Sequence, residues 1–446
     1  MMWPFDRIYR FFDLLYNTLS RDLVYPYVIG TLMLKDIPAM TREKLCPHYQ
    51  LRKTSLKYPN KVALIQAETG REMSFKQFDE YCSKVANYLL SRKDFKKSTD
   101  KMQGPSDRSS IALICDNQLE FFPIWMGINR AGFIPALVNY KLSGENLKHC
   151  LKIVDTKAII VSADFLKIIQ DLDLSDIGSP EIFVLHKHGK SQEKTSATNF
   201  NEIMDSSSPI FPESDHYRPN DLHDNQTFMY TSGTTGFPKA AKMNQIRFGL
   251  GMCAGPKVYK ISKDDRFFCS LPLYHANAAL ILGMQVLRNG NCMVLAEKFS
   301  ASKFWNYIIK YDCQGFNYIG EICRYLLAQP ENLQIDQGHK LKFMIGNGLK
   351  PELWSKFTKR FNIPRVCEFY GATEGCSNLA NFSNKEGAVG FISQLLHFID
   401  PVKIIKVDQE TEEPIRDPKT GFVLHADFNE PGMIIGQIKT EGIQKF

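Results

Sequence analysis

The feature that most constrains this chain is an alternation of short apolar runs with amphipathic helical segments, which begins near residue 45. In the first half, the strand-like runs 111–115 and 133–138 flank a helical stretch at 119–130, and a helix at 145–154 leads to a run at 157–161. Strands that alternate with helices predict βαβ units and a parallel sheet covered on both faces. The sequence therefore predicts an α/β protein.

The same alternation resumes in the second half, after a connection at 205–226 that is rich in serine, proline and acidic residues. Strand-like runs are expected at 266–271, 292–296, 315–319, 342–346 and 365–371. Helices are expected to begin at Asn277, Ser302 and Pro351. From about Phe398 the pattern changes to short alternating strands, which predicts a small β-rich unit.

These changes of pattern suggest two doubly wound α/β subdomains followed by the start of a β-rich subdomain. We expect an amphipathic segment at 1–44, a first α/β subdomain at 45–224, a second at 225–397 and the β-rich part at 398–446. A polar, turn-forming stretch at 94–110 is expected to be a solvated loop.

Composition excludes some classes of protein. With 446 residues, of which 44% are hydrophobic, the chain can bury a large core. The formal charge of +7 is modest and no dense basic block occurs, so nucleic acid is not an expected partner, whereas an anionic ligand or an acidic membrane surface is compatible. Eleven cysteines are scattered singly, without CxxC pairs, which indicates reduced, buried thiols in a protein that faces the cytosol.

The amino-terminal segment carries an apolar helical stripe from Ile8 to Leu19. The stripe suits a helix packed on its own protein as well as one that lies in a membrane interface. The uncharged stretch from Leu23 to Leu34 is interrupted by Pro26 and is shorter than the roughly 20 residues that span a bilayer. No secretory signal pattern is present.

A polar loop, "TSGTTGFPK", follows an apolar run directly. Gly233 and Gly236 allow positive φ angles and close approach of the backbone to a ligand, while the neighbouring hydroxyls and Lys239 add donors and a positive charge. Such a group is typical of a nest for phosphate oxygens. It is not a Walker A loop, and a Gly/Thr-rich hairpin without a ligand would explain the loop alone equally well.

Three further motifs lie downstream: "LPLYHANA" with His275, "IGNGLKP" with Gly346 and Gly348, and "CEFYGATEG" with Tyr370 and Glu374. The two glycines and the aromatic follow strand-like runs, at the edge where open α/β sheets bind ligands. Each motif also has an ordinary reading, as a structural histidine, a simple turn, a packed tyrosine or a surface carboxylate.

Taken in this order, the four motifs resemble the core motifs of the adenylate-forming superfamily. "YIGEICRYLL", "IGNGLKPELW" and "EFYGATEG" make the chain similar to the very long-chain acyl-CoA synthetase, or fatty acid transport protein, family. The resemblance runs from about Arg21 to the last residue. It implies the large amino-terminal domain of the adenylate-forming fold, without its carboxyl-terminal domain.

The resemblance also implies a two-step reaction. A fatty acid carboxylate attacks the α-phosphorus of ATP and releases pyrophosphate, and the thiol of CoA then displaces AMP from the acyl-adenylate. Such chemistry depends on positioning and on neutralising charge. The family's cofactors would be ATP, Mg²⁺ and CoA as co-substrate, and its further partners a long-chain fatty acid and a membrane surface.

The loop Thr231 to Lys239 would hold the β- and γ-phosphates, Thr373 would contact the α-phosphate, and Tyr370 would stack on adenine. Glu374 would bind Mg²⁺, and His275 would lie near the reacting carboxylate. The residues expected to bind ATP are Tyr230, Thr231, Ser232, Gly233, Thr234, Thr235, Gly236, Lys239, Gly346, Asn347, Gly348, Tyr370, Gly371 and Thr373. The expected catalytic residues are Thr373, Glu374, His275 and Lys239.

The family pattern continues past Phe446 with a Gly-Asp that grips the ribose, a hinge and a late lysine that completes adenylation. Without these parts the chain is expected to adenylate fatty acid far more slowly than a full-length relative. The alternatives are a non-catalytic fatty acid transport or nucleotide-binding protein, and an adenylating enzyme for an aryl or amino acid. The family implies a membrane-associated protein of the endoplasmic reticulum, plasma membrane or peroxisome, with its catalytic domain facing the cytosol. Acyl chain length and oligomeric state have no signal in the sequence.

Overall fold

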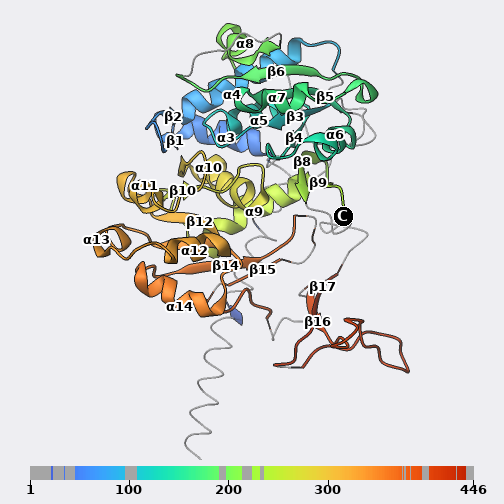
Figure 1. Cartoon of the computed structure of the whole chain (residues 1–446), viewed down its shortest axis with the longest axis vertical. Coiled ribbons are helices and arrows are strands. Elements are labelled where there is room, and N and C mark those ends of the chain that lie inside the picture. Colours follow the sequence, from blue (N-terminus) through green and yellow to red (C-terminus); the bar gives the residue numbers. More distant parts are fainter. Residues whose placement is uncertain are drawn as a thin grey trace, which may run out of the picture.

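The computed structural model describes residues 46–95, 108–189, 197–212, 223–231, 236–373, 375, 378–381, 383–393, 401–427 and 429–437, together with 22, 23 and 35. Within these ranges the chain forms two large sheets, each covered by helices, and a small two-stranded sheet that stands apart from them (Figure 1). The predicted α/β class is confirmed. The helix expected at 8–19 lies outside the described residues.

The first sheet has seven strands in the order β7-β6-β5-β3-β4-β8-β9. All neighbouring pairs are parallel except β8 and β9, which form an antiparallel hairpin. The strands are β3 (Ser110–Ile114), β4 (Ile134–Leu137), β5 (Thr156–Ser162), β6 (Glu181–Leu185), β7 (Thr198–Asn199), β8 (Asn225–Thr231) and β9 (Lys239–Asn244). The helices of this part are α3 (Pro47–Lys57), α4 (Phe75–Ser91), α5 (Phe121–Arg130), α6 (Gly144–Lys152), α7 (Leu166–Gln170) and α8 (Phe200–Ser206), with short 3₁₀ turns η3 (Ala163–Phe165) and η4 (Ser175–Ile177).

The second sheet has eight strands in the order β15-β14-β13-β12-β10-β11-β1-β2. Its strands are β1 (Val62–Gln66), β2 (Glu72–Ser74), β10 (Arg266–Cys269), β11 (Cys292–Leu295), β12 (Gly315–Ile319), β13 (Phe343–Asn347), β14 (Val366–Tyr370) and β15 (Leu379–Ala380). Its helices are α9 (Gln245–Tyr259), the π-helix η5 (Asn277–Gly283), α10 (Met284–Asn289), α11 (Phe304–Lys310), α12 (Gly320–Leu327), α13 (Leu333–Asp336) and α14 (Pro351–Arg360). The strands expected in this half are confirmed to within two residues at each end.

Sheet membership does not follow the predicted division at 224/225. Strands β1 and β2, from the expected first subdomain, pair with the second sheet, and β8 and β9, from the expected second, pair with the first. The apolar periodicity of a strand predicts its local conformation but not the strand with which it pairs. The exchange of β1–β2 and β8–β9 between the sheets therefore could not be predicted from the sequence. It interleaves the two halves of the chain.

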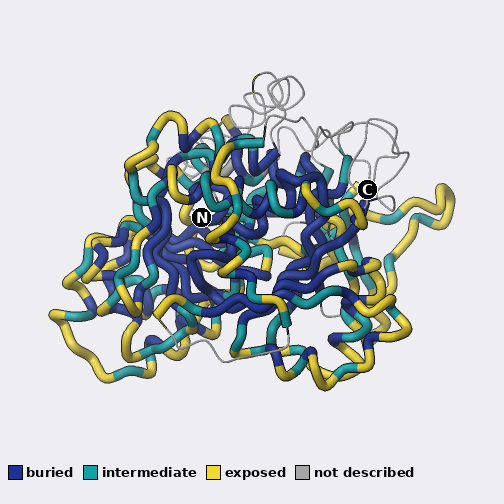
Figure 2. The backbone as a smooth tube through the Cα atoms, turned by 90° about the horizontal axis from the view of Figure 1, so that it is seen from above, coloured by how far each residue is buried: buried dark blue, intermediate teal, exposed yellow. Residues whose placement is uncertain are grey.

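Burial follows the alternation of side chains along the strands. In β3, Ile111 and Leu113 belong to a large core that extends into the second sheet, whereas Ala112 and Ile114 belong to a smaller core under α6 and α7. Figure 2 shows the buried positions running through the interior and the exposed positions gathered on the outer loops. The two sheets therefore pack as one body.

The last described part is β-rich, as expected. Strands β16 (Val402–Ile405) and β17 (Met433–Gly436) pair antiparallel, and isolated bridges such as Arg416 with Val423 extend the segment between them. The cysteines within the described ranges are buried and form no disulfide bond with one another. Within the described ranges, no helix combines the length and the apolar character needed to cross a membrane.

Candidate nucleotide site in the crevice between the sheets

The polar loop is held by the β8–β9 hairpin, in which Thr231 pairs with Lys239. Lys239 is exposed and Thr231 is half-buried, while Ser232, Gly233, Thr234 and Thr235 lie outside the described residues. Gly236 has a φ of +126°, a conformation that L side chains rarely adopt. The loop therefore emerges at the carboxyl end of β8, as a phosphate-binding loop requires.

Two aromatic residues flank the loop. The side chain of Tyr230 is buried in the smaller core, and its hydroxyl donates to the Cys150 carbonyl at 2.7 Å, so only its main chain faces the loop. Phe237, near the carboxyl end of the loop, is half exposed and stacks on the His149 ring at 4.7 Å between centroids. These contacts fix both ends of the loop to α6 and the first sheet.

The Gly-Asn-Gly motif lies at the carboxyl end of β13. A Cβ on Gly346 would lie 2.1 Å from the Tyr318 carbonyl oxygen, so only glycine fits there, and Gly348 has a φ of +79°. Asn347 accepts a hydrogen bond at 3.1 Å from Asn277. The turn is thus packed closely against β12.

Strand β14 ends at Tyr370, whose side chain is 47% exposed and available for stacking. A Cβ on the next residue, Gly371, would approach the Asn378 side-chain oxygen to 2.5 Å. Thr373 is half-buried and its main-chain carbonyl accepts a hydrogen bond from Arg247, while Glu374 lies outside the described residues. Because β13 and β14 are parallel neighbours, the glycine turn and Tyr370 lie side by side at one sheet edge.

His275 follows the carboxyl end of β10 and is exposed, although the surrounding protein desolvates its ring enough to lower its pKa. The imidazole is therefore uncharged at neutral pH. Asn117, from the end of β3 in the other sheet, supports this segment: its carbonyl oxygen accepts from the Leu273 N–H at 3.0 Å, and its amide donates to the Leu271 carbonyl at 2.9 Å.

Three residues shape the site but are not among the expected site residues, although Asn277 and Glu368 lie within the motifs LPLYHANA and CEFYGATEG. Asn277 joins β12 to the glycine turn, since its amide donates to the Tyr318 carbonyl at 3.2 Å and to Asn347. Glu368 lies under the turn without any exposed surface. Arg247 reaches from α9 to Thr373. Their roles depend on contacts between distant segments, which local patterns do not encode.

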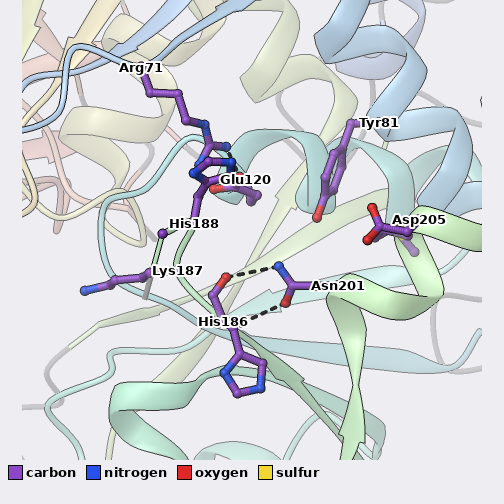
Figure 3. Close-up of a pocket in the computed structure, with 10 residues that line it drawn as sticks. Arg71, Tyr81, Glu120, His186, Lys187, His188, Asn201 and Asp205 are labelled. Carbon is purple, nitrogen blue, oxygen red and sulfur yellow. Dashed lines mark hydrogen bonds and ion pairs between the residues drawn. The ribbon is translucent and has the colours of Figure 1, made fainter. Parts of the chain in front are cut away.

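A separate cavity of about 400 Å³ lies next to β6 and the β1–β2 turn (Figure 3). Figure 3 shows Arg71 pointing at Glu120, with which it forms an ion pair, and Asn201 bonded to the main chain of His186. The polar groups that line this cavity thus largely satisfy one another. This cavity is a polar space between the sheets, and none of the residues that line it is an expected nucleotide-binding residue.

Three carboxylates beside this cavity converge on one ammonium group. Lys187 contacts Asp116, Asp164 at 2.8 Å, and Glu297, and these acids come from the ends of β3, β5 and β11. Burial alone would lower the pKa of Lys187, but its hydrogen bonds to the three carboxylates raise that pKa overall. The ammonium occupies the centre of a carboxylate group that could otherwise hold a metal ion. The cluster therefore links the two sheets electrostatically.

Comparison with known proteins identifies the family. The family model described as AMP-binding enzyme matches residues 51–427. The chain belongs to this family. It is 34% identical to the long-chain fatty acid transport protein 1 of Mus musculus over 86% of this chain and 57% of that protein. It is 30% identical to the human long-chain fatty acid transport protein 6 over 83% of this chain and 57% of that protein.

Solved structures share the fold of this chain. An anthranilate CoA ligase, AuaEII, in complex with anthranoyl-AMP matches with a TM-score of 0.69 at 18% identity, over 83% of this chain and 67% of that one. The amino-terminal domain of FACL13 from Mycobacterium tuberculosis matches with a TM-score of 0.65 at 19% identity, over 81% of this chain and 84% of that one. The chain thus has the fold of the amino-terminal domain of adenylate-forming enzymes and spans just over half of the curated relatives.

Proposed function

We propose that this chain binds MgATP in the crevice between its two sheets and uses it to activate a long- or very long-chain fatty acid as an acyl-adenylate, which CoA then converts to acyl-CoA. The observation that supports the proposal is that the described parts of the expected motifs follow the carboxyl ends of β8, β10, β13 and β14. The relatives' names, long-chain fatty acid transport proteins, support a long-chain fatty acid as the substrate and a link to its transport. We propose that this transport is uptake at a membrane surface that faces the cytosol.

The adenine pocket would be formed by Tyr370 and the turn at 346–348. Gly346 lets the turn pack closely against β12, because a side chain there would collide with Tyr318. Base stacking on an exposed aromatic contributes roughly 1–3 kcal/mol per base. The half-exposed ring of Tyr370 is suited to this contact.

The phosphates would lie against the loop at 231–239, with Lys239 neutralising charge and Thr373 near the α-phosphate. Glu374 would hold Mg²⁺, which prefers oxygen ligands and substrate phosphates. His275, uncharged because desolvation lowers its pKa, would orient the fatty acid carboxylate by a hydrogen bond without neutralising the nucleophile. Holding the carboxylate in line with the α-phosphorus is the main contribution that such a reaction needs.

Pyrophosphate release tests the proposal. The chain is incubated with ATP, Mg²⁺ and a long-chain fatty acid, with and without CoA, beside its Glu374→Ala variant. We expect fatty acid-dependent release from the chain and its loss in the variant. Fatty acid binding with no release and no measurable ATP binding would instead support a non-catalytic binding protein.

A further inference from the structure

A buried carboxylate lies beneath the proposed adenine pocket. Glu368, in β14, has no exposed surface, and burial raises its pKa. One of its oxygens accepts the Leu349 main-chain N–H at 3.1 Å, and the other accepts the hydroxyl of Tyr318. Desolvating a carboxylate costs several kcal/mol, so these hydrogen bonds are needed to hold it there.

The partners of Glu368 belong to the elements that would form the pocket. Tyr318 lies in β12, and Leu349 directly follows Gly348 of the glycine turn. Glu368 and Tyr370 are two residues apart in β14, so their side chains project to the same face of the sheet. The Glu368 carboxylate therefore joins β14, which carries the Tyr370 ring, to the neighbouring glycine turn.

The turn is restrained from a second direction by Asn277, whose amide donates to Asn347 and to the Tyr318 carbonyl. Asn317 donates in turn to the side-chain oxygen of Asn277 at 3.2 Å. Strand β12 thus supports the turn in two ways. The side-chain amides of Asn317 and Asn277 hold Asn347, and the Tyr318 hydroxyl holds Glu368, which in turn binds the Leu349 N–H.

We propose that Glu368 is a positioning residue for the nucleotide base: it fixes the spacing between the Gly348–Leu349 turn and the Tyr370 ring, so that an adenine fits between them. The inference rests on the proposed function. It separates recognition of the base, which depends on Glu368, from recognition of the phosphates, which depends on the loop at 231–239.

The test compares two probes on the full chain. ATP uses both the base pocket and the phosphate loop, whereas inorganic tripolyphosphate uses the loop alone. Affinities are measured by titration calorimetry with Mg²⁺ for the chain and for Glu368→Leu, Glu368→Gln and Tyr318→Phe. Asp265→Asn serves as the control, because Asp265 is a buried acid that binds Lys342 at 2.7 Å at the other end of β10.

We expect Glu368→Leu to weaken ATP by about tenfold, which corresponds to roughly 1.4 kcal/mol, and to leave tripolyphosphate unchanged. Glu368→Gln keeps a hydrogen-bond acceptor and should therefore lose less ATP affinity than Glu368→Leu. Tyr318→Phe should bind ATP a few-fold more weakly and tripolyphosphate as the unmodified chain does. Asp265→Asn should lower the melting temperature without changing either affinity. If Glu368→Leu fails to fold, the glutamine and phenylalanine variants decide.

Two outcomes overturn the inference while the proposed function stands: unchanged ATP affinity in the Glu368 and Tyr318 variants, or parallel weakening of both probes. Binding of neither probe by the unmodified chain overturns the proposed function and the inference together.

Discussion

The guanidinium of Arg247 donates a hydrogen bond to the main-chain carbonyl of Thr373, 126 residues further along the chain. Arg247 lies in the first turn of α9, directly after the β8–β9 hairpin that holds the polar loop, and its own N–H is capped by Asn244 at 3.1 Å. Thr373 lies three residues beyond the end of β14. This contact therefore connects the phosphate side of the proposed site to the segment that leads to Glu374.

Replacing Arg247 with Met should weaken MgATP and tripolyphosphate alike, by about tenfold, because the loop and the Thr373 segment would no longer be held together. A hydrogen bond from a charged donor contributes roughly 1.5–3 kcal/mol. Titration calorimetry measures both affinities. Arg266→Met is the matched control, since Arg266 donates to the Tyr311 carbonyl at the amino end of β10 and should leave both values unchanged. Loss of ATP affinity alone would contradict this account.

Replacing Tyr370 with Ala should weaken ATP by roughly five- to 150-fold through the loss of about 1–3 kcal/mol of stacking, and Tyr370→Phe should retain most of the affinity. Tripolyphosphate should bind to both variants as it does to the unmodified chain. Tyr325, which is 46% exposed on α12, provides an alanine control of similar exposure. Equal affinities of Tyr370→Ala and Tyr325→Ala for ATP would show that the Tyr370 ring does not bind the base.

The sequence predicts the features that depend on neighbouring residues, but not those that depend on contacts between distant segments of the chain. The strands at 315–319, 343–347 and 366–370 follow from local apolar runs, and their shared edge follows from parallel pairing. The exchange of β1–β2 and β8–β9 between the sheets does not follow, because periodicity carries no information about the pairing partner. The motifs predict the residues of the nucleotide site, and those roles stay predictions.

The supporting residues could not be predicted for the same reason. Glu368 lies within the CEFYGATEG motif, but only its contacts with Tyr318 and Leu349 show why a carboxylate is buried there. Asn117 follows a strand and Asn277 lies in the LPLYHANA motif, but neither position reveals that these side chains join segments from different parts of the chain. Glu374 and the residues at 232–235 lie outside the described residues, so their expected roles stay predictions.

The cluster around Lys187 should govern how firmly the sheets are joined. Lys187→Met would leave three carboxylates facing one another, with the lysine side chain only 14% exposed in the intact cluster. Removing one partner of such a buried ion pair costs about 3–5 kcal/mol in the free energy of unfolding. Urea unfolding measures the loss. Lys340→Met is the control, because the Lys340–Asp312 pair is exposed and should contribute less than about 1 kcal/mol. Similar losses in both variants would refute the linking role.

Acid should destabilise the chain through His48. Burial, assisted by the charge of Arg130, lowers the pKa of His48 from 6.5 to about 3. Between these values the unfolded chain binds a proton that the folded chain does not, so stability is full above pH 6.5 and falls as the pH drops. The contribution is at most about 1.4 kcal/mol per pH unit. Urea unfolding at several pH values between 7.5 and 5 gives the free energy of unfolding as a function of pH. This free energy should fall less steeply with decreasing pH in His48→Gln than in the unmodified chain. Identical slopes would exclude His48 as the cause.

The most direct measurement of the central claim is photoaffinity labelling of the full chain with 8-azido-ATP and Mg²⁺, followed by identification of the labelled peptides. The account predicts labelling within residues 345–349 and 366–373, on both sides of the proposed base pocket, and protection by excess ATP. Label in the separate cavity at Arg71 or His186, or label that ATP does not displace, would contradict it.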